Sequence, residues 1–169
     1  MSDYHDSVLL EECLEGLCIQ PKGVYVDVTF GGGGHSKALI SKLKGGHLYA
    51  FDQDEDSFKN EFDDDRFTLI NANFRDLKNS LRFYGIKEVD GILADLGVSS
   101  HQFDVPNRGF SIRFEAELDM RMDKNADLSA VKVLNEYEQE ELRRILKTYG
   151  EIKRPGTLAR IICEYRSIK

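Results

Sequence analysis

The chain has 169 residues, of which 41% are hydrophobic and 31% charged, and its formal net charge at pH 7 is −7. This length suffices for one compact α/β domain with a buried core and is short for two. No apolar run approaches the roughly 18 residues of a membrane span, and the acidic first residues lack the basic region and apolar stretch of a secretory signal, so we expect a cytoplasmic protein without a membrane partner.

The chain is expected to open with an amphipathic helix over residues 8–17. Its apolar residues recur at the spacing of one helix face, and they are Leu9, Leu10, Cys13, Leu14 and Leu17. Asp6 or Ser7 is positioned to cap the free amides of the first turn. Pro21 and Gly23 then break the helix.

Strands and helices alternate in the next part of the chain. The predicted strands cover residues 24–30, 47–54, 67–74 and 89–97. The predicted helices between them cover residues 36–43 and 55–62, and a third passes through Leu77, Leu81 and Tyr84. This alternation predicts an α/β fold with a parallel sheet of about four strands. The unbroken apolar centre of the fourth strand indicates that both of its faces are covered.

The last third of the chain begins with a long segment, residues 98–128, that shows no clear period. Its phenylalanines, methionines and arginines are unlike a disordered tail, so we expect an ordered loop packed over the functional site. From Ser129 onward the pattern is helical, with a capping signal at Asn135 to Glu138. The two apolar stripes that follow are Leu142, Ile145, Leu146 and Tyr149, and then Leu158, Ile161, Ile162 and Tyr165.

Basic residues are concentrated at the end of the chain. Residues 143–169 contain eight lysines and arginines against two glutamates, a balance of +6, which leaves −13 for the remainder. On sequence alone we favour solvated basic helix faces, with an RNA-binding surface as the alternative. Arg108, Arg113 and Arg121 in the long loop are further candidates for contacts with RNA phosphates.

Cysteine and histidine spacing gives no sign of a metal site or a disulfide. Cys13, Cys18 and Cys163 form no CxxC pair and are odd in number, which suits a reducing compartment. The four histidines are scattered without metal-ligand spacing. We therefore predict reduced thiols and no metal.

The candidate site begins at a glycine-rich loop after the first predicted strand. Asp27 precedes the run Gly31 to Gly34, and a helix follows whose free amides suit a pyrophosphate or a carboxylate. The dinucleotide fingerprint GxGxxG fails at Ser36, its third glycine position. An acidic residue followed by glycines is typical of methyltransferases. The sequence therefore favours a methyltransferase site over an NAD-binding site. A purely structural glycine turn is the remaining alternative.

Polar residues at the ends of the second and third predicted strands extend this site. Asp52 lies 18 residues after Gly34, close to the spacing at which an acid meets ribose hydroxyls. Asn73 has an amide that suits an adenine edge, and Phe74 has a ring that suits its face. The alternative for Phe74 is a place in the core.

Asp95 ends the fourth predicted strand and is the candidate catalytic residue. Methylation of an exocyclic amine must free a lone pair that is delocalised into the ring, so an acceptor for the amine hydrogens is useful there. In amino-methyltransferases, the usual signature at this place is Asp or Asn followed by two prolines and an aromatic residue. This chain has DLGVSS instead, so its base-holding part must be built differently.

Seven segments, taken in order, resemble a known family. They are HDSVLLEE, YVDVTFGGGGHS, AFDQD, ANF, GILADLGVSSHQFD, RGFS and LDMRMD, and they resemble the bacterial 16S ribosomal RNA cytosine-N4 methyltransferases. The match spans nearly all of residues 4–123, and LARIICEYR is similar to the helical portion that continues the family.

The resemblance implies a Rossmann-like methyltransferase fold that uses S-adenosylmethionine. It implies an N-terminal methyltransferase domain over residues 1–123 and the start of a helical insert over 124–169. The acceptor it implies is a decoding-region cytosine in 16S ribosomal RNA or the small subunit. The cofactor contacts that it implies are Gly33, Gly34, His35, Asp52, Phe74, Asp95 and Gln102. The sequence predicts no oligomeric state.

The chain departs from the family in two ways. Ser7 stands where the opening motif usually has proline. Family members are nearly twice as long and add three strands after the helical insert. If this is the whole chain, we expect the fourth strand to form an unprotected apolar edge, and the chain to be less stable than a full-length relative and inactive or only weakly active.

Two other functions stay open at this point. One is a fragment that binds the cofactor without catalysing transfer. The other is an NAD-dependent oxidoreductase, which is disfavoured by Ser36 and by the lack of an obvious proton-donating tyrosine and lysine pair.

Overall fold

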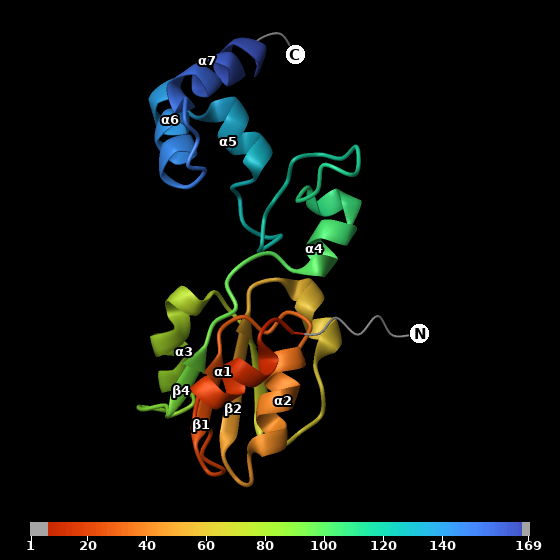
Figure 1. The fold of residues 1–169 in the computed structure, drawn as a ribbon, viewed down its shortest axis with the longest axis vertical. Helices are drawn as coiled ribbons and strands as arrows, with labels where there is room; N and C mark the ends of the chain where they lie inside the picture. Colours follow the sequence, from red (N-terminus) through yellow and green to blue (C-terminus); the bar gives the residue numbers. More distant parts are fainter. Residues whose placement is uncertain (1–6, 167–169) are drawn as a thin grey trace. The chain divides into compact units, whose positions relative to one another are not determined.

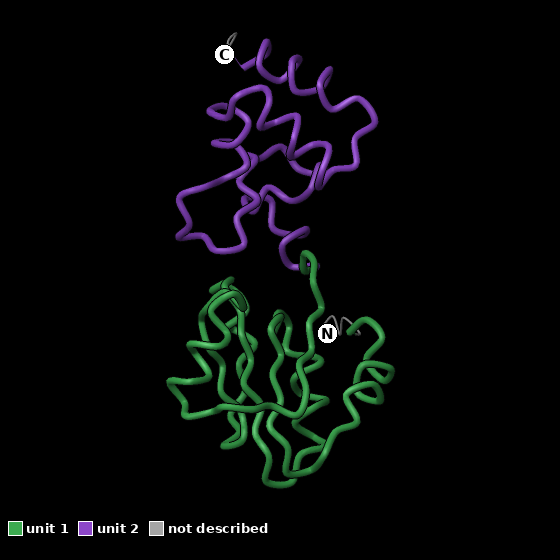
Figure 2. The backbone as a smooth tube through the Cα atoms, turned by 90° about the vertical axis from the view of Figure 1, so that its left-hand side faces the viewer, with its two compact units in different colours: residues 1–99 green, residues 100–169 purple. Residues whose placement is uncertain are grey.

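The computed structural model describes residues 7–166, so the proposed cap Asp6 lies outside the described residues. The contacts divide the chain into two compact units, residues 1–99 (unit 1) and residues 100–169 (unit 2), which Figure 2 shows in different colours. The predicted domain boundary after residue 123 rests on the family resemblance and stays a prediction.

Unit 1 contains a four-stranded parallel sheet. Its strands are β1 (Val24–Asp27), β2 (His47–Asp52), β3 (Phe67–Asn71) and β4 (Gly91–Leu93). The order in the sheet is β3-β2-β1-β4, and all three pairings are parallel. Val26 of β1 lies opposite Tyr49 of β2 and Ile92 of β4. The predicted α/β fold with about four parallel strands is confirmed.

Helices cover both faces of this sheet. The helices are α1 (Leu10–Gly16), α2 (Gly34–Lys42) and α3 (Leu77–Phe83), with 3₁₀ turns η1 (Glu55–Asn60) and η2 (Phe74–Asp76). Figure 1 shows α1 and α2 on the near face of the sheet. Tyr25 and Leu48 point to that face and pack with α1 and α2. Val26 and Phe51 point to the other face, where Leu81 of α3 completes a second core cluster.

Several predicted boundaries in unit 1 are wrong. Ser7 does not cap α1, because Leu9 is the N-cap residue and no side chain bonds the first turn. The helix predicted over residues 55–62 is the 3₁₀ turn η1, and Phe62 beyond it stacks on Phe67 with 4.1 Å between ring centroids.

The strand predicted over residues 89–97 is the three-residue β4, which among residues 7–166 pairs with β1 alone and so lies at an edge of the sheet. The side chain of Ile92 is 50% exposed, so this strand is not covered on both faces. Within the described residues, β4 is thus an edge strand, and the expectation that this edge is unprotected stays a prediction.

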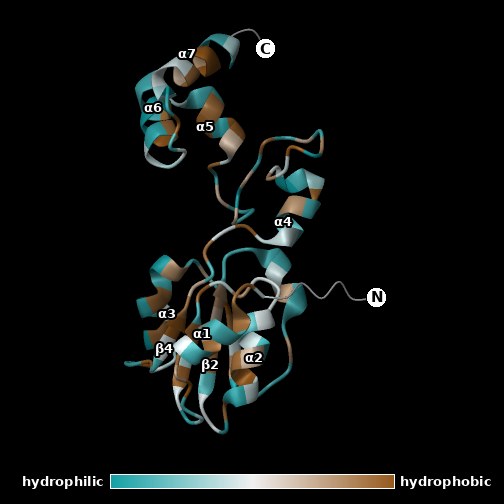
Figure 3. Cartoon of the chain, viewed as in Figure 1, coloured by the Kyte–Doolittle hydropathy of each residue, from teal (hydrophilic) through white to brown (hydrophobic). Residues whose placement is uncertain are grey.

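Unit 2 is mainly helical. Its elements are α4 (Ser100–Asp104), η3 (Pro106–Arg108), α5 (Ala130–Glu136), α6 (Gln139–Thr148) and α7 (Pro155–Arg166). Leu142 of α6 and Ala159 of α7 are buried. Figure 3 shows that α6 carries mostly hydrophilic residues.

The capping signal predicted at Asn135 to Glu138 is wrong. Asn135 lies inside α5, and its amide donates to the carbonyl of Val131 at 2.9 Å, because a short polar side chain in a helix can bond the preceding turn. The residue that caps α5 is Ser129, whose hydroxyl accepts from the amide of Lys132 at 3.3 Å.

Candidate functional site

The loops after the four strands of unit 1 share one edge of the sheet, because parallel strands end at the same side. The chain leaves β1 for β2 on one side, and β4 pairs with β1 on the other. Strand order therefore reverses at β1, and ligands of doubly wound sheets bind at such a reversal, beyond the carboxyl ends of the strands. Gly33, Asp52, Phe74 and Asp95 all follow or end these strands, so unit 1 brings them to this one edge.

The glycine loop follows β1 and needs glycine for two reasons. Gly31 has a φ of 50° and Gly33 a φ of 76°, which are left-handed values that other residues rarely adopt. A Cβ on Gly33 would lie 2.9 Å from Cζ of Phe30, and one on Gly34 would collide with the hydroxyl of Ser7. Gly32 is exposed, and a Cβ added at this residue would have no atom within 4 Å. There is therefore open space beside the loop.

Asp52, the last residue of β2, is bonded to the glycine loop. Its Oδ2 accepts from the amide of Gly31 at 2.8 Å, and its Oδ1 accepts from the amide of Asp54 at 2.9 Å. Burial raises the pKa of the Asp52 carboxyl, and these backbone hydrogen bonds oppose that rise. A carboxylate has about four acceptor positions, so these contacts leave room for hydroxyl groups of a ligand to bond Asp52.

A buried carboxylate, Asp27, ties the two ends of the glycine loop together. Asp27 is 1% exposed, and its Oδ2 accepts from the hydroxyl of Ser36 in α2 at 2.7 Å. Its Oδ1 accepts from the amide of Thr29 at 3.0 Å and from the Thr29 hydroxyl at 3.3 Å. Burial raises the pKa of Asp27, while the hydrogen bonds from Ser36 and Thr29 lower it.

The sequence did not predict that Thr29 and Ser36 bond the buried carboxylate of Asp27. In the sequence, Ser36 is distinguished only by standing at the third glycine position of the dinucleotide fingerprint. It is fully buried and bonded to Asp27, so a polar side chain fills the place where that fingerprint has glycine. The apolar run around Thr29 gave no signal of a polar role.

Asn73 and Phe74 follow β3. The amide of Asn73 donates to Oε1 of Gln53 at 2.6 Å, and its oxygen accepts from the amide of Arg75 at 2.9 Å. The Asn73 side chain therefore caps η2 and bonds Gln53. Fewer of its hydrogen-bonding positions are left for an adenine edge. Phe74 is 45% exposed, so its alternative assignment to the core is wrong and its ring is open to a flat ligand.

Asp95 lies two residues beyond β4 and is exposed. Its backbone amide donates to the hydroxyl of Thr29 at 2.7 Å. Among residues 7–166, its carboxylate has no hydrogen bond or ion pair, so it is open to an acceptor substrate.

Two residues that the resemblance assigns to the cofactor have other contacts in the structure. Nε2 of His35 lies 3.0 Å from the carbonyl of Val8, and this buried ring links α2 to the segment before α1. Gln102 belongs to unit 2, is 5% exposed, and donates to the sulfur of Met122 at 3.2 Å. Their roles as cofactor contacts stay predictions.

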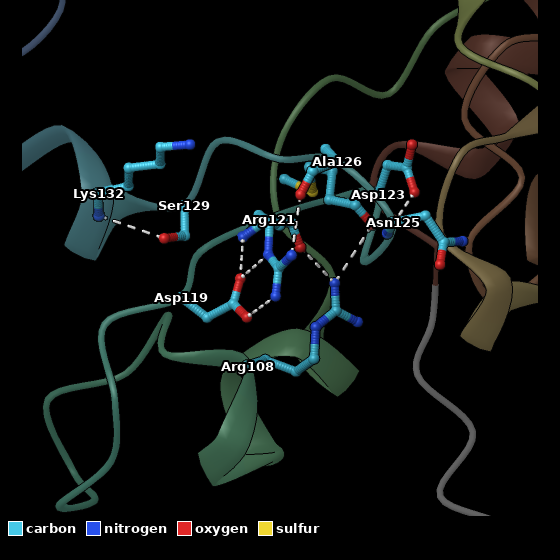
Figure 4. A network of polar contacts seen from close by, with 9 residues as sticks. Arg108, Asp119, Arg121, Asp123, Asn125, Ala126, Ser129 and Lys132 are labelled. Carbon is cyan, nitrogen blue, oxygen red and sulfur yellow. Dashed lines mark hydrogen bonds and ion pairs between the residues drawn. The ribbon is translucent and has the colours of Figure 1, made fainter.

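The arginines of the long loop mainly hold unit 2 together. Figure 4 shows Arg108 and Arg121 directed at backbone carbonyls of the loop. Arg108 is 5% exposed and donates to the carbonyl of Arg121 at 2.7 Å. Arg121 bonds Asp119 through Nε and Nη2, which lowers the pKa of Asp119, and it donates to the carbonyl of Ala126 at 2.9 Å.

The prediction that Arg108 contacts RNA phosphates is therefore wrong, because its side chain is buried. Arg121 is likewise committed to Asp119. Arg113 is exposed and pairs with Asp104 at 2.7 Å.

The part of the chain between residues 7 and 166 offers no group of three His, Cys, Asp or Glu side chains that could hold a metal ion. No helix in that part is long and apolar enough to cross a membrane. Cys13, Cys18 and Cys163 are free thiols.

Comparison with known proteins adds the following. Residues 2–169 match the MraW methylase family. The chain is 62% identical over 165 residues to the ribosomal RNA small subunit methyltransferase H of Flavobacterium johnsoniae, with 97% of this chain and 55% of the relative covered. For the protein of the same name from Christiangramia forsetii, the identity is 56% over 167 residues, with 98% and 55% covered. The chain thus spans about half the length of the curated relatives that it matches.

Proposed function

Because the chain belongs to the MraW methylase family, we propose that it binds S-adenosylmethionine at the carboxyl edge of its sheet and takes part in methylating the N4 amine of a cytosine in 16S ribosomal RNA. The observation that carries this proposal is the bond between Asp52 and the amide of Gly31. This bond holds the carboxylate of Asp52 against a glycine loop at the reversal of strand order, which supports a role for Asp52 in binding the ribose of a nucleoside cofactor.

The residues of this edge fit the cofactor group by group. The glycine loop has open space beside Gly32 and opens α2, whose first amides suit the carboxylate of the methionine part. Asp52 accepts from the ribose hydroxyls, and the half-exposed ring of Phe74 covers the adenine. When bound, the cofactor supplies a methyl group on a positively charged sulfur, which is already a good donor.

Asp95 is the residue that we assign to the acceptor. Its exposed carboxylate accepts a hydrogen bond from the N4 amine of cytosine and so holds the amine with its lone pair toward the methyl donor. After the methyl group has been transferred, the amine must lose a proton, and we assign the exposed carboxylate of Asp95 to receive it. Rate enhancement then comes mainly from positioning.

The proposed RNA partner is supported by the turn between α6 and α7 in unit 2. Four basic residues flank this turn, are exposed, and form no ion pair among residues 7–166: Arg144, Lys147, Lys153 and Arg154. The amide of Ile152 closes the turn by donating to the carbonyl of Leu146 at 3.1 Å. Tyr149 within it is 76% exposed. Basic side chains around an exposed aromatic ring suit phosphates and a stacked base.

The test of the function is transfer of labelled methyl from S-adenosylmethionine to small ribosomal subunits that lack the modification. We expect label at a cytosine N4 with a full-length relative that carries these motifs, and an Asp95→Asn variant should lose transfer while keeping cofactor affinity. Absence of transfer by the full-length protein would refute the proposal. Calorimetric titration of this chain should show binding of S-adenosylmethionine and none of NAD.

Cofactor affinity should also depend on pH through Asp52. The ionised carboxylate accepts from ribose hydroxyls, and burial raises its pKa above the ordinary value. Affinity should therefore weaken as pH falls through this raised pKa, at a higher pH than for an exposed aspartate. Calorimetry across the acid range checks this expectation.

Asp52→Asn should bind more weakly and lose this pH dependence. Asp65→Asn is a matched control, since Asp65 is an exposed acid in the same unit. The control should keep both the affinity and its pH dependence. A pH dependence that survives in Asp52→Asn would contradict the assignment.

A further inference from the structure

A single hydroxyl group, that of Thr29, joins two parts of the carboxyl edge. It lies 3.3 Å from Oδ1 of Asp27 and 2.7 Å from the backbone nitrogen of Asp95. The amide of Asp95 can only donate, and Oδ1 of Asp27 already accepts from the amide of Thr29. The direction of both bonds is therefore fixed: the hydroxyl donates its one hydrogen to Asp27 and accepts from Asp95.

The bond to Thr29 is important because little else holds Asp95. β4 ends at Leu93, whose carbonyl accepts from the amide of Val28 at 3.0 Å. Between Ala94 and Val98, the described structure has no other backbone hydrogen bond. The path of the chain at Asp95 is thus set by one side chain of the glycine loop.

Asp27 makes this support rigid. Its carboxylate is 1% exposed and is bonded both to Thr29 and to Ser36 in α2. Hydrogen bonds to a buried carboxylate are strong, and breaking one leaves a buried group without its partner. The position of the Thr29 hydroxyl is therefore determined by the same residue that ties the glycine loop to α2.

We propose that Thr29 is a positioning residue, which couples the glycine loop to Asp95 and so holds the acceptor-binding carboxylate in register with the methyl donor. This inference rests on the proposed function for its catalytic meaning, whereas its structural content, the restraint on Asp95, is independent of that function.

The structural content is tested by amide hydrogen exchange of this chain, followed by NMR. Thr29→Val keeps the shape and removes the hydroxyl, whereas Thr29→Ser keeps the hydroxyl. Loss of one hydrogen bond of ordinary strength predicts that the Asp95 amide exchanges about tenfold faster in Thr29→Val. In Thr29→Ser the exchange rate should stay close to that of the parent chain.

Thr68→Val is the matched control. The Thr68 hydroxyl bonds Nε2 of His47 at 2.9 Å in the same unit, near the opposite end of the sheet. This variant loses a similar hydrogen bond and should leave the exchange of the Asp95 amide unchanged. Equal exchange of that amide in Thr29→Val and in the parent chain would overturn the inference, as would equal acceleration in Thr68→Val.

The catalytic meaning is tested in a full-length relative with the corresponding substitutions. We expect Thr29→Val to lower kcat for methyl transfer about tenfold with little change in the cofactor dissociation constant, and Thr29→Ser to restore kcat. A loss of cofactor affinity as large as the loss in kcat would overturn the inference, because Thr29 would then support the loop alone. If the unmodified protein neither binds the cofactor nor transfers methyl, the proposed function fails, and the exchange experiment still decides the restraint on Asp95.

Discussion

The two compact units are stabilised by different interactions. Unit 1 contains all the buried hydrophobic side chains of the described residues except Leu142 and Ala159. In unit 2, arginine side chains bond backbone carbonyls instead. Arg108 donates to the carbonyl of Arg121, and Arg166 donates to those of Leu134 and Tyr137 at the end of α5.

This difference determines which substitutions each unit will tolerate. Burial of apolar surface is non-directional, so unit 1 should respond to the volume that a substitution removes. A guanidinium that donates to carbonyls has fixed geometry, and its removal leaves those carbonyls without partners. Unit 2 should therefore respond to the loss of single donors.

The largest expected effect is a loss of volume in the core of unit 1. Leu39 of α2 is 1% exposed and belongs to the cluster with Tyr25 and Leu48. Leu39→Ala should lower the free energy of unfolding by about 2–5 kcal/mol, measured by urea denaturation. Leu96→Ala, at a side chain that is 68% exposed, should change it by less than about 0.5 kcal/mol. Similar losses in both variants would contradict an apolar core as the main source of stability in unit 1.

The sequence predicted the sheet well because the strands of unit 1 are continuous apolar runs. The predicted starts at residues 24, 47 and 67 coincide with those of β1, β2 and β3. The predicted end of the first strand lies beyond that of β1, because the apolar run continues past Asp27 into Val28 and Phe30, which are buried without belonging to the strand. Hydropathy alone also could not show that, among the described residues, β4 pairs with β1 alone.

The candidate site was predictable to the extent that it depends on strand ends. Asp52 and Asp95 reach one edge of the sheet because parallel strands end together, which the alternation of elements implies. The link from Ser36 through Asp27 and Thr29 to Asp95 depends on side-chain directions across three segments, and no sequence spacing encodes these directions.

A smaller effect is expected for the loss of a buried donor in unit 2. Arg108→Met keeps most of the apolar stem but removes the bonds to the carbonyls of Arg121 and Met122. We expect a loss of about 1–3 kcal/mol, seen as faster amide exchange in peptides that cover residues 119–130. Arg113→Met is the control, because Arg113 is exposed and pairs with Asp104, so at most about 1 kcal/mol should be lost. Equal effects of the two substitutions would show that burial of Arg108 contributes nothing to the stability of unit 2.

The roles of the unit 2 arginines were mispredicted because their carbonyl partners are set by the path of the loop. One signal was nevertheless present in the sequence, namely an aspartate two residues before an arginine. It occurs at Asp119 and Arg121, where the carboxylate accepts from the arginine amide and guanidinium. The same geometry recurs at Asp64 and Arg66, whose guanidinium also donates to a carbonyl, that of Leu43. In this chain, the spacing therefore indicates an arginine whose guanidinium also donates to a backbone carbonyl.

The smallest effect is expected for an exposed ion pair of unit 2. Glu140 pairs with Arg143 at 2.8 Å on α6, with both side chains at least half exposed. Glu140→Gln should cost no more than about 0.5 kcal/mol. Glu141→Gln is a matched control, since Glu141 also lies in the first turn of α6 and loses the same interaction with the helix dipole without an ion pair. The difference between the two variants, measured by thermal unfolding, should disappear in 1 M salt, where the Debye length falls to about 3 Å. A difference as large as that expected for Arg108→Met would mean that exposed charges stabilise unit 2 as much as the buried guanidinium does.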